Sequence, residues 1–415
     1  MKNRKNFWLY TTGLFISFIG SGVQDIALPL FILDVTGSGT AMGTFMIIST
    51  IPRFILYPLA GVVGDRVNRK QIMVWMDFGR GSIILLLAVL AARNVLTIPI
   101  LFAAQFFVSI MNALFGPATL AMLPDIVKGE DLMRANSIVE AVSNFSYIVG
   151  PVLGGVIYGL GGIRVAFLVN GFSFLGSGVS ELFITYHQKT KKFEKVQEVI
   201  EDLRGGITFI RTHRGLSTLL VFGLVINFLS GPVFVVLIPY VLRVVIQFSA
   251  EQYGMLQTSF VAGILIGNII IGAVLAKSKV QPMVTRGFIV ETGLKFVFVA
   301  LIFPKLVETL GYASWIMFCV LFLVFILMGI FNAFVNTPID VGFQKLTPTE
   351  VRARVFSVSG IISQGVVPIG YGIMGIALDR FPAHRVALAV TVVLLFVVLL
   401  YIFKYLKEVC REFES

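Results

Sequence analysis

The sequence predicts an all-α polytopic membrane protein, with twelve transmembrane helices arranged as two six-helix repeats. Of its 415 residues, 57% are hydrophobic and only 13% are charged, whereas a typical soluble domain has about a quarter charged residues. The apolar residues form runs long enough to cross a bilayer, about 20 residues each as a helix. The second half of the chain also repeats features of the first in the same order.

The apolar runs are expected to be helical, because backbone groups in hydrocarbon must find their hydrogen-bond partners within the segment. Their interiors lack the alternation of membrane barrel strands. The first run is too long for a signal-peptide core and contains Ser17, Ser21, Gln24 and Asp25, so we expect it to stay in the mature protein. The twelve runs lie near 8–34, 41–63, 71–92, 97–122, 132–160, 163–186, 216–243, 251–276, 283–303, 312–338, 353–379 and 385–407.

The distribution of basic residues predicts the orientation. Of the 33 Lys and Arg residues, 24 fall on the side of the N-terminus, six on the opposite side and three within the helices. Because cytoplasmic loops carry the excess of Lys and Arg, we expect a multi-pass plasma (inner) membrane protein with both termini in the cytoplasm. Basic loops facing anionic lipid account for the net charge of +11, so no nucleic-acid partner is expected.

The longest polar stretch divides the chain into three parts: an N-terminal six-helix bundle (1–186), a cytoplasmic linker (187–215) and a C-terminal six-helix bundle (216–415). Apolar residues recur at helical spacing in the linker, which predicts an amphipathic helix on the membrane surface. The two halves share small-residue and polar positions, such as Ser21-Gly22 with Ser230-Gly231 and Asn112 with Asn332. Parallel repeats of this kind are typical of secondary transporters with a substrate site between the halves.

Charged residues gather between the second and third runs, in Gly61-x-x-x-Asp65-Arg66-x-x-Arg69-Lys70. This pattern resembles the loop signature of the major facilitator superfamily. Asn68 stands where the family usually has Gly, and we expect it to tolerate the same left-handed turn. The resemblance implies the major facilitator fold and a cytoplasmic gate, in which Asp65 contacts the start of the eleventh helix when the pore faces out.

The expected gate set also includes charges outside the loop. We interpret Asp77 and Arg80, three residues apart in the third helix, as a local pair or as gate partners. Arg354 is a possible partner of Asp65. For Arg69 and Lys70 the alternative is a simple positive-inside anchor. The full gate set is Gly61, Asp65, Arg66, Arg69, Lys70, Asp77, Arg80 and Arg354.

A second pattern, Ser146-x-x-x-Gly150-Pro151-x-x-Gly154-Gly155, is similar to the antiporter signature of the superfamily, with Ser for the first Gly. The fourth helix lacks the Arg of larger drug antiporters, and Gln105 is its only long polar side chain. With "LPDIV…LMRANSI" after it, this helix is similar to the drug:proton antiporter-3 branch, which includes macrolide-efflux and enterobactin-export proteins. The resemblance implies proton-coupled efflux of hydrophobic or amphipathic compounds by alternating access.

Ionisable residues inside membrane segments are candidate sites, because burying a charge there costs at least about 2.5 kcal/mol. Asp25 is a candidate proton carrier or a structural hydrogen-bond partner, and Glu140 is a second carrier or a residue of the cytoplasmic water layer. Arg53 could meet Asp25 or an anionic substrate. The predicted set for proton coupling and the substrate cavity is Asp25, Glu140, Gln24, Arg53, Gln105, Asn112, Glu291 and Lys295.

Glu291 and Lys295 have the i,i+4 spacing of an intrahelical ion pair, which could also serve structure alone. Asn332, Asn336 and Asp340 share one helix face, where helix packing or gate contacts are the alternatives. Asp34, Glu181 and Asp340 lie at predicted helix ends and are expected to be hydrated.

Enzyme chemistry, cofactors and metals are not expected. The chain has no phosphate-binding Gly-x-x-x-x-Gly-Lys-Ser/Thr loop, its two cysteines are far apart in sequence, and its three histidines are scattered. The expected partners are a small hydrophobic or amphipathic substrate, protons and the bilayer, with the chain as a monomer. The alternatives are a dedicated exporter of a siderophore, lipid or peptide, and a membrane receptor or scaffold that binds without transporting.

Overall fold

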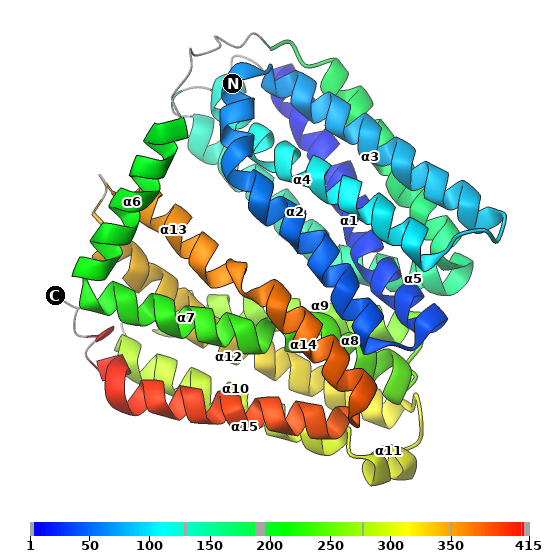
Figure 1. Ribbon diagram of the computed structural model, residues 1–415, viewed down its shortest axis with the longest axis vertical. Coiled ribbons are helices and arrows are strands. Elements are labelled where there is room, and N and C mark those ends of the chain that lie inside the picture. The colour runs from blue at the N-terminus through cyan, green and yellow to red at the C-terminus, as the bar shows by residue number, and fades with distance from the viewer. Residues whose placement is uncertain are drawn as a thin grey trace. The chain divides into compact units, whose positions relative to one another are not determined.

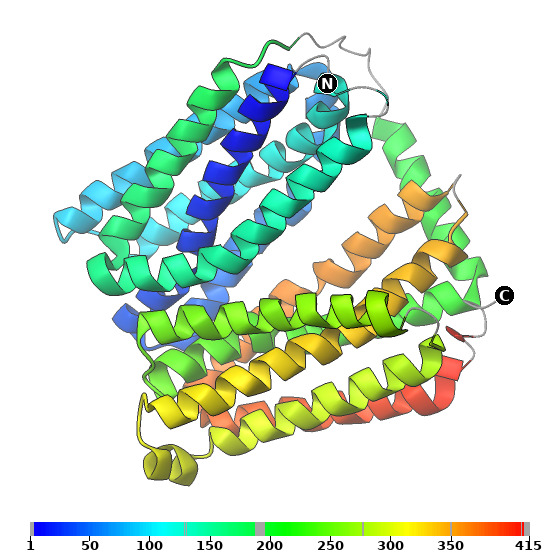
Figure 2. The same ribbon diagram turned by 180° about the vertical axis from the view of Figure 1, so that it is seen from behind.

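Helices are the only regular elements in the part of the chain that a computed structural model describes (Figures 1 and 2). That part comprises residues 4–127, 129, 131–186, 196–275, 278–348, 351–407 and 409–410, without the side chains of 57–66, 196–203, 353 and 357. The all-α prediction is therefore confirmed. The chain divides into unit 1 (Met1–Thr36, Phe45–Glu194 and Ser249–Thr258) and unit 2 (Gly37–Thr44, Lys195–Phe248 and Ser259–Ser415).

Unit 1 contains α1 (Arg4–Thr36), most of α2 (Gly39–Arg66), α3 (Arg69–Ala92), α4 (Ile98–Ile126) and α5 (Asp131–Leu182). The 52 residues of α5 would be about 78 Å long as one straight helix, far more than a bilayer needs. At Gly162 the helical geometry breaks (φ 62°, ψ −165°), and Figure 2 shows α5 folding back on itself. The break falls between the fifth and sixth predicted segments.

The turn between α2 and α3 differs in its geometry from the expected one. Asn68 has φ −57° and ψ 116°, so it does not adopt the left-handed conformation. Its side-chain oxygen instead accepts a hydrogen bond from the Gln71 amide, which makes it the N-cap of α3. Asn is among the best N-cap residues, and this role explains its presence better than tolerance of a strained turn.

In unit 2 the predicted eleventh segment corresponds to one candidate span, Arg354–Arg380, with a break inside it. The predicted eleventh segment is two helices, separated at Val366 just before Pro368, and a short helix follows the ninth segment. Unit 2 contains α6 (Val196–Thr212), α7 (Arg214–Pro232), α8 (Ile238–Tyr240), most of α9 (Ala250–Ile270), α10 (Val280–Leu301), α11 (Pro304–Leu310), α12 (Trp315–Leu346), α13 (Arg352–Gly365), α14 (Val367–Arg380) and α15 (Ala383–Tyr401). Ile210 of α6 packs with Leu220, Val355 and Val358, so the apolar face of the linker helix meets α7 and α13 at that point.

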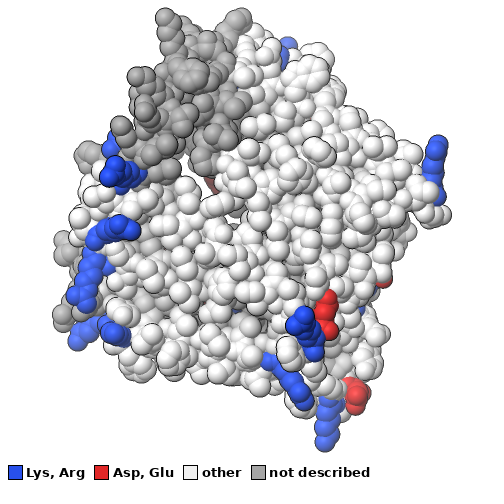
Figure 3. All heavy atoms as spheres, viewed as in Figure 1, with Lys and Arg blue, Asp and Glu red and all other residues white. Residues whose placement is uncertain are grey.

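Among the described residues, ten helices are long and apolar enough to cross a membrane, or eleven if the bent pair α10 and α11 forms one span. The long α5 is counted once in these numbers, and the count of twelve stays a prediction. On the face shown in Figure 3, the surface over the middle of α7, α14 and α15 carries no charged side chains, and Lys and Arg gather near both ends of these helices. An apolar belt between charged ends is what a bilayer requires of a helical bundle.

The N-terminus of α2 belongs to unit 2, where a distant carboxylate caps it. The two oxygens of Asp379, on α14, accept hydrogen bonds from the Gly39 amide at 2.6 Å, the Thr40 amide at 3.0 Å and the Ser38 hydroxyl at 2.7 Å. A carboxylate at this position satisfies amides that have no partner within the helix, and it is also favoured by the helix dipole.

Candidate functional site

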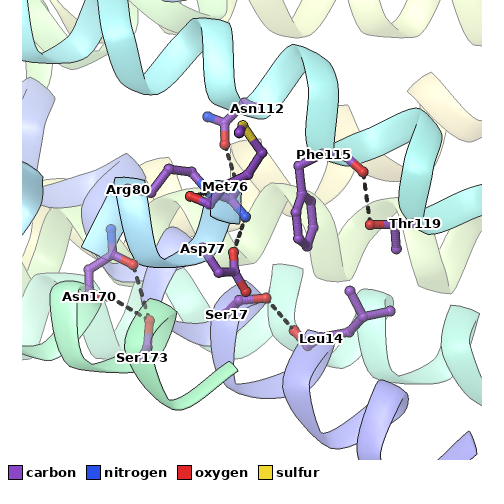
Figure 4. Close-up of polar contacts among 10 residues, drawn as sticks. All are labelled: Leu14, Ser17, Met76, Asp77, Arg80, Asn112, Phe115, Thr119, Asn170 and Ser173. Carbon is purple, nitrogen blue, oxygen red and sulfur yellow. Dashed lines mark hydrogen bonds and ion pairs between the residues drawn. The ribbon is translucent and has the colours of Figure 1, made fainter. Parts of the chain in front are cut away.

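An arginine and an aspartate are buried together inside unit 1. Asp77 is completely buried and Arg80 is 4% exposed, both on α3. Arg80 Nη2 donates to Asp77 Oδ1, its Nη1 donates to Asn112 Oδ1 on α4 at 2.6 Å, and its Nε donates to the Met76 carbonyl at 3.3 Å (Figure 4). The expected i,i+3 contact is thus present, and Asn112 joins it.

Two aromatic rings hold the same guanidinium. Its central carbon lies 4.1 Å from the ring centre of Phe115 on α4 and 4.4 Å from that of Phe174 on α5. Arginine between aromatic faces is stabilised by cation–π attraction, more strongly where water is excluded. Arg80 is therefore fixed by α3, α4 and α5 together.

Glu181, at the C-terminal end of α5, belongs to the same cluster. It is completely buried, so its expected hydration is wrong, whereas Asp34 and Asp340 are exposed as expected. The cause is the close packing of α1: a Cβ atom at Gly13 would lie 3.2 Å from Ser177 Oγ and 3.7 Å from Glu181 Cγ. Both Glu181 oxygens lack a hydrogen-bond partner among the described residues.

Gln24 and Gln105 have polar partners within unit 1. Gln24 of α1 is buried, and its carbonyl accepts a hydrogen bond from Asn170 of α5. Ser173 donates to the carbonyl oxygen of Asn170 at 2.8 Å (Figure 4 shows Asn170 beside Ser173). Gln105 of α4 donates to Ser49 of α2 at 3.0 Å. The hydrogen bonds of Gln24 and Gln105 link α1 to α5 and α4 to α2, and their amide groups could instead bind a polar ligand.

The two carrier candidates lie in different surroundings. Asp25 is exposed on α1, and the positive charge of Arg53, also exposed on α2, is near enough to act on it. The two side chains form no ion pair with each other, so both partners considered for Arg53 stay predictions. Glu140 is exposed on α5 and makes no ion pair with any described residue.

Part of the gate set has contacts inside unit 1. Arg69 Nη1 donates to Asp125 at 2.7 Å and to the Ala121 carbonyl at 3.2 Å, and Lys70 Nζ donates to the Leu182 carbonyl at 2.8 Å. These contacts tie the start of α3 to the ends of α4 and α5, which a topological anchor alone does not require.

Tyr186 completes this group at the start of α3, as its hydroxyl donates to Asp125 at 2.6 Å. Burial and the Asp125 carboxylate raise the pKa of Tyr186 to about 12, so the phenol remains a donor at neutral pH. Gly61, Asp65 and Arg66 lie among the residues whose side chains are not described, and Arg354 is exposed at the start of α13. The proposed role of Asp65 in the gate stays a prediction.

The antiporter-type motif forms a close contact between helices. A Cβ atom at Gly150 would lie only 2.9 Å from the Gly22 Cα atom on α1, so the two backbones touch at these glycines. A Cβ atom at Gly155 would lie 2.4 Å from the Ala250 carbonyl at the start of α9. Gly154 packs against Val23, Pro151 lies inside α5, and Ser146 donates to the Val142 carbonyl at 2.9 Å.

Unit 2 contains a cavity of about 560 Å³, lined by residues of α7 with its π-helical continuation (Val233–Leu237), α9, α10, α12, α13 and α15. On α10 the Lys295 ammonium lies 2.9 Å from the Glu291 carboxylate, as their spacing predicted, and both side chains reach the cavity. On α12 Asn336 donates to Asn332 at 2.8 Å, and both also line it. Its aromatic lining consists of Phe222, Phe234, Phe260, Phe288, Phe343 and Phe356.

Bundles of apolar helices that enclose polar and charged side chains are typical of membrane transporters. The sequence profile described as "Major Facilitator Superfamily" matches residues 10–370. The chain therefore belongs to the major facilitator superfamily and has its fold.

Similar curated proteins are transporters rather than enzymes. The chain is 23% identical over 383 residues to macrolide efflux protein A of Streptococcus pyogenes, with 91% of each chain covered. It is 24% identical to macrolide efflux protein A of Enterococcus faecalis, covering 79% of this chain and all of that protein. It is 21% identical to the staphyloferrin A transporter of Staphylococcus aureus, with 89% of each covered.

Solved structures agree on the fold. A bacterial homologue of the iron transporter ferroportin, in its inward-facing state, matches with a TM-score of 0.70 at 17% identity, covering 96% of this chain and 98% of that one. The nucleoside transporter NupG matches with a TM-score of 0.71 at 13% identity, covering 96% and 99%. At these identities the likeness carries no information about substrate.

Proposed function

We propose that this chain is a secondary active transporter of the plasma membrane, which exports hydrophobic or amphipathic compounds in exchange for protons by alternating access. The observation that carries the proposal is the cavity of unit 2. Its size is within the range of small-molecule sites, about 300–1,000 Å³, and it combines an aromatic wall with a few polar groups. The relatives named macrolide efflux protein A support the direction of transport and the substrate class.

The chemistry of the cavity suits an amphipathic compound that carries a few polar groups. Six phenylalanines offer flat apolar surface, while the amides of Asn332 and Asn336 can exchange hydrogen bonds with hydroxyl, carbonyl or amine groups. The Glu291–Lys295 pair is neutral as a whole but presents both signs of charge. A basic drug could draw on Glu291, and an acidic compound on Lys295.

Proton coupling is proposed for unit 1, where Asp25 and Glu140 remain the carrier candidates. Asp25 has an exposed carboxyl group in a membrane segment, with Arg53 near enough to compete with a proton for its negative charge. Both termini are proposed to be cytoplasmic, on the excess of Lys and Arg in the loops of that side.

The test is a growth-inhibition panel across drug classes, in cells that express the chain, with and without a protonophore. Protection against macrolides that the protonophore abolishes would support the proposal. Phe356→Ala removes an exposed aromatic group from the cavity wall and should weaken protection, while Phe403→Ala, an exposed phenylalanine outside the cavity lining, should not. No protection by the well-expressed protein against any class would contradict multidrug efflux.

A dedicated exporter is the second candidate, because the cavity has an amide-rich face and a lysine as well as aromatic rings. The similarity to the staphyloferrin A transporter, at 21% identity, is compatible with an acidic, chelating cargo. Export of one such compound, without protection in the drug panel, would favour it. A receptor that does not transport would show neither activity, and the antiporter-type motif argues against that reading.

A further inference from the structure

We propose that Glu181 is a proton-binding site, which holds its proton while it is buried beside Asp77 and Arg80. The role of this site in transport rests on the proton-coupled export proposed above. That Glu181 binds a proton does not depend on that proposal. The three residues come from two helices, α3 and α5, and each is at most 4% exposed in unit 1.

The charges of the cluster do not balance if all three groups ionise. Two carboxylates face one guanidinium, which would leave one net negative charge in a volume that water does not reach. A buried charge without a partner is so unfavourable that the group takes up a proton instead. One of the two carboxyl groups is therefore neutral.

The hydrogen bonds of Arg80 decide which carboxyl group that is. Its Nη2 is in direct contact with Asp77, its Nη1 is directed to Asn112, and its Nε is directed to the Met76 carbonyl, while two aromatic rings pack against the guanidinium. Glu181 receives no hydrogen bond from Arg80, and the donor beside it is the uncharged Ser177 hydroxyl. Asp77 is thus the paired anion, and Glu181 carries the proton.

Among the residues that the structure describes, the groups that surround Glu181 offer no second positive charge. On α1 the phenol of Tyr10 is close enough to sense the Glu181 charge, and it donates its own hydrogen bond to the Thr119 carbonyl of α4 at 3.0 Å. On α3 the charged neighbours are Asp77 and Arg80, and on α5 the Ser177 hydroxyl lies beside both carboxyl groups. Ser177 Oγ and Asp77 Oδ2 are also without a hydrogen-bond partner in the described part of the chain.

These unpartnered oxygens are groups that a water molecule could use. In the proposed step, water admitted to the cluster accepts the proton from Glu181. The O–H bond breaks, its electron pair stays on the carboxylate, and the proton leaves as hydronium. The anion so formed would compete with Asp77 for Arg80, which would replace an ion pair within α3 by one between α3 and α5.

The direct test is infrared spectroscopy of the purified protein at neutral pH, in H₂O and in D₂O. A protonated carboxyl group has a C=O stretching band at a higher frequency than the bands of an ionised carboxylate. We expect a band of this kind that is lost in Glu181→Gln and kept in the control Glu308→Gln, an exposed glutamate on α11. The same acid band in the wild type and in folded Glu181→Gln would overturn the proposal.

A second variant tests the assignment even if Glu181→Gln folds poorly. Asp77→Asn removes the anion that pairs with Arg80, so Glu181 should ionise in its place, and its acid band should disappear although the residue is still present. A band that persists in Asp77→Asn would show that Glu181 does not belong to this charge balance.

The transport arm uses liposomes with erythromycin as the probe. Glu181→Gln should lose proton counterflow and pH-gradient-driven uptake, while substrate exchange across the membrane without a gradient continues. If the wild type moves no protons, the proposed export function fails and the infrared result still decides the proton site. If the wild type moves protons and Glu181→Gln does so equally well, the coupling role of Glu181 is wrong.

Discussion

At the residue scale, two ion pairs follow from helical spacing and differ in their surroundings. Asp77 and Arg80 are packed inside unit 1 with Asn112 and two aromatic rings, whereas Glu291 and Lys295 line the cavity of unit 2. A buried pair is rarely a net source of stability, because both charges have lost their hydration. The Glu291–Lys295 pair also lies where a polar or charged group of a ligand would meet it.

The Glu291–Lys295 pair leads to a prediction about folded yield. Glu291→Gln or Lys295→Met alone strands a charge in a site of low dielectric, and each should destabilise the protein by roughly 3–5 kcal/mol. The double variant should be closer to the wild type, because no charge is left unpaired. Fluorescence size-exclusion chromatography after a heating series measures this. Equal yields from all three variants would mean that the pair is hydrated and energetically minor.

At the element scale, glycines determine how closely α1 and α5 approach. The Gly150 and Gly22 backbones touch, and α1 also covers Glu181 through Gly13. Gly150→Ala should therefore force the helices apart and lower stability by about 1–3 kcal/mol, as overpacking does. Gly116→Ala is the matched control, because a Cβ atom there would meet nothing within 4 Å. A thermal-shift assay in detergent should show a lower Tm for Gly150→Ala alone.

The cap on α2 gives a second prediction at this scale. Asp379→Ala removes the acceptor of two backbone amides and one hydroxyl at the start of the helix. Loss of such a cap costs about 0.5–2 kcal/mol. We expect a modest fall in Tm and faster hydrogen exchange at residues 39–41, with Glu308→Gln unchanged. Unaltered exchange in this turn would show that water replaces the carboxylate without loss.

At the scale of the whole molecule, the sequence predicted the elements better than the site. Hydropathy and spacing gave the membrane segments, the turn near Gly162 and both ion pairs, because these depend on neighbours in the chain. Glu181 was misjudged because its burial depends on α5 folding back so that α1 covers it. Asp379 could not be found either, since its partners lie some 340 residues away.

The cavity shows the same limit at a larger scale. Its lining comes from six helices, so hydropathy could place each helix in the membrane without showing which faces meet. Helical spacing did identify Asn332, Asn336 and Asp340 as one face, but it favoured helix packing over gate contacts as the role of that face. That this face borders a cavity became apparent only from the packing of unit 2.

The last prediction concerns coupling across the whole transport cycle. Asp25→Asn keeps the size and polarity of the side chain and removes its titration. If Asp25 carries the transported proton, an imposed pH gradient should no longer drive uptake of erythromycin into vesicles, while binding in the cavity of unit 2 should remain within a few-fold of the wild type. Binding should survive because Asp25 belongs to unit 1 and does not line that cavity.

The control for Asp25→Asn is Asp34→Asn, which alters an exposed aspartate at the end of the same helix. It should retain uptake driven by the pH gradient. Vesicle uptake at several imposed gradients, with the amount of inserted protein measured in parallel, separates coupling from expression. Uptake in Asp25→Asn that still rises with the gradient would remove Asp25 as a carrier. If proton counterflow persists at the same time, Glu181 and Glu140 become the carboxyl groups to test next.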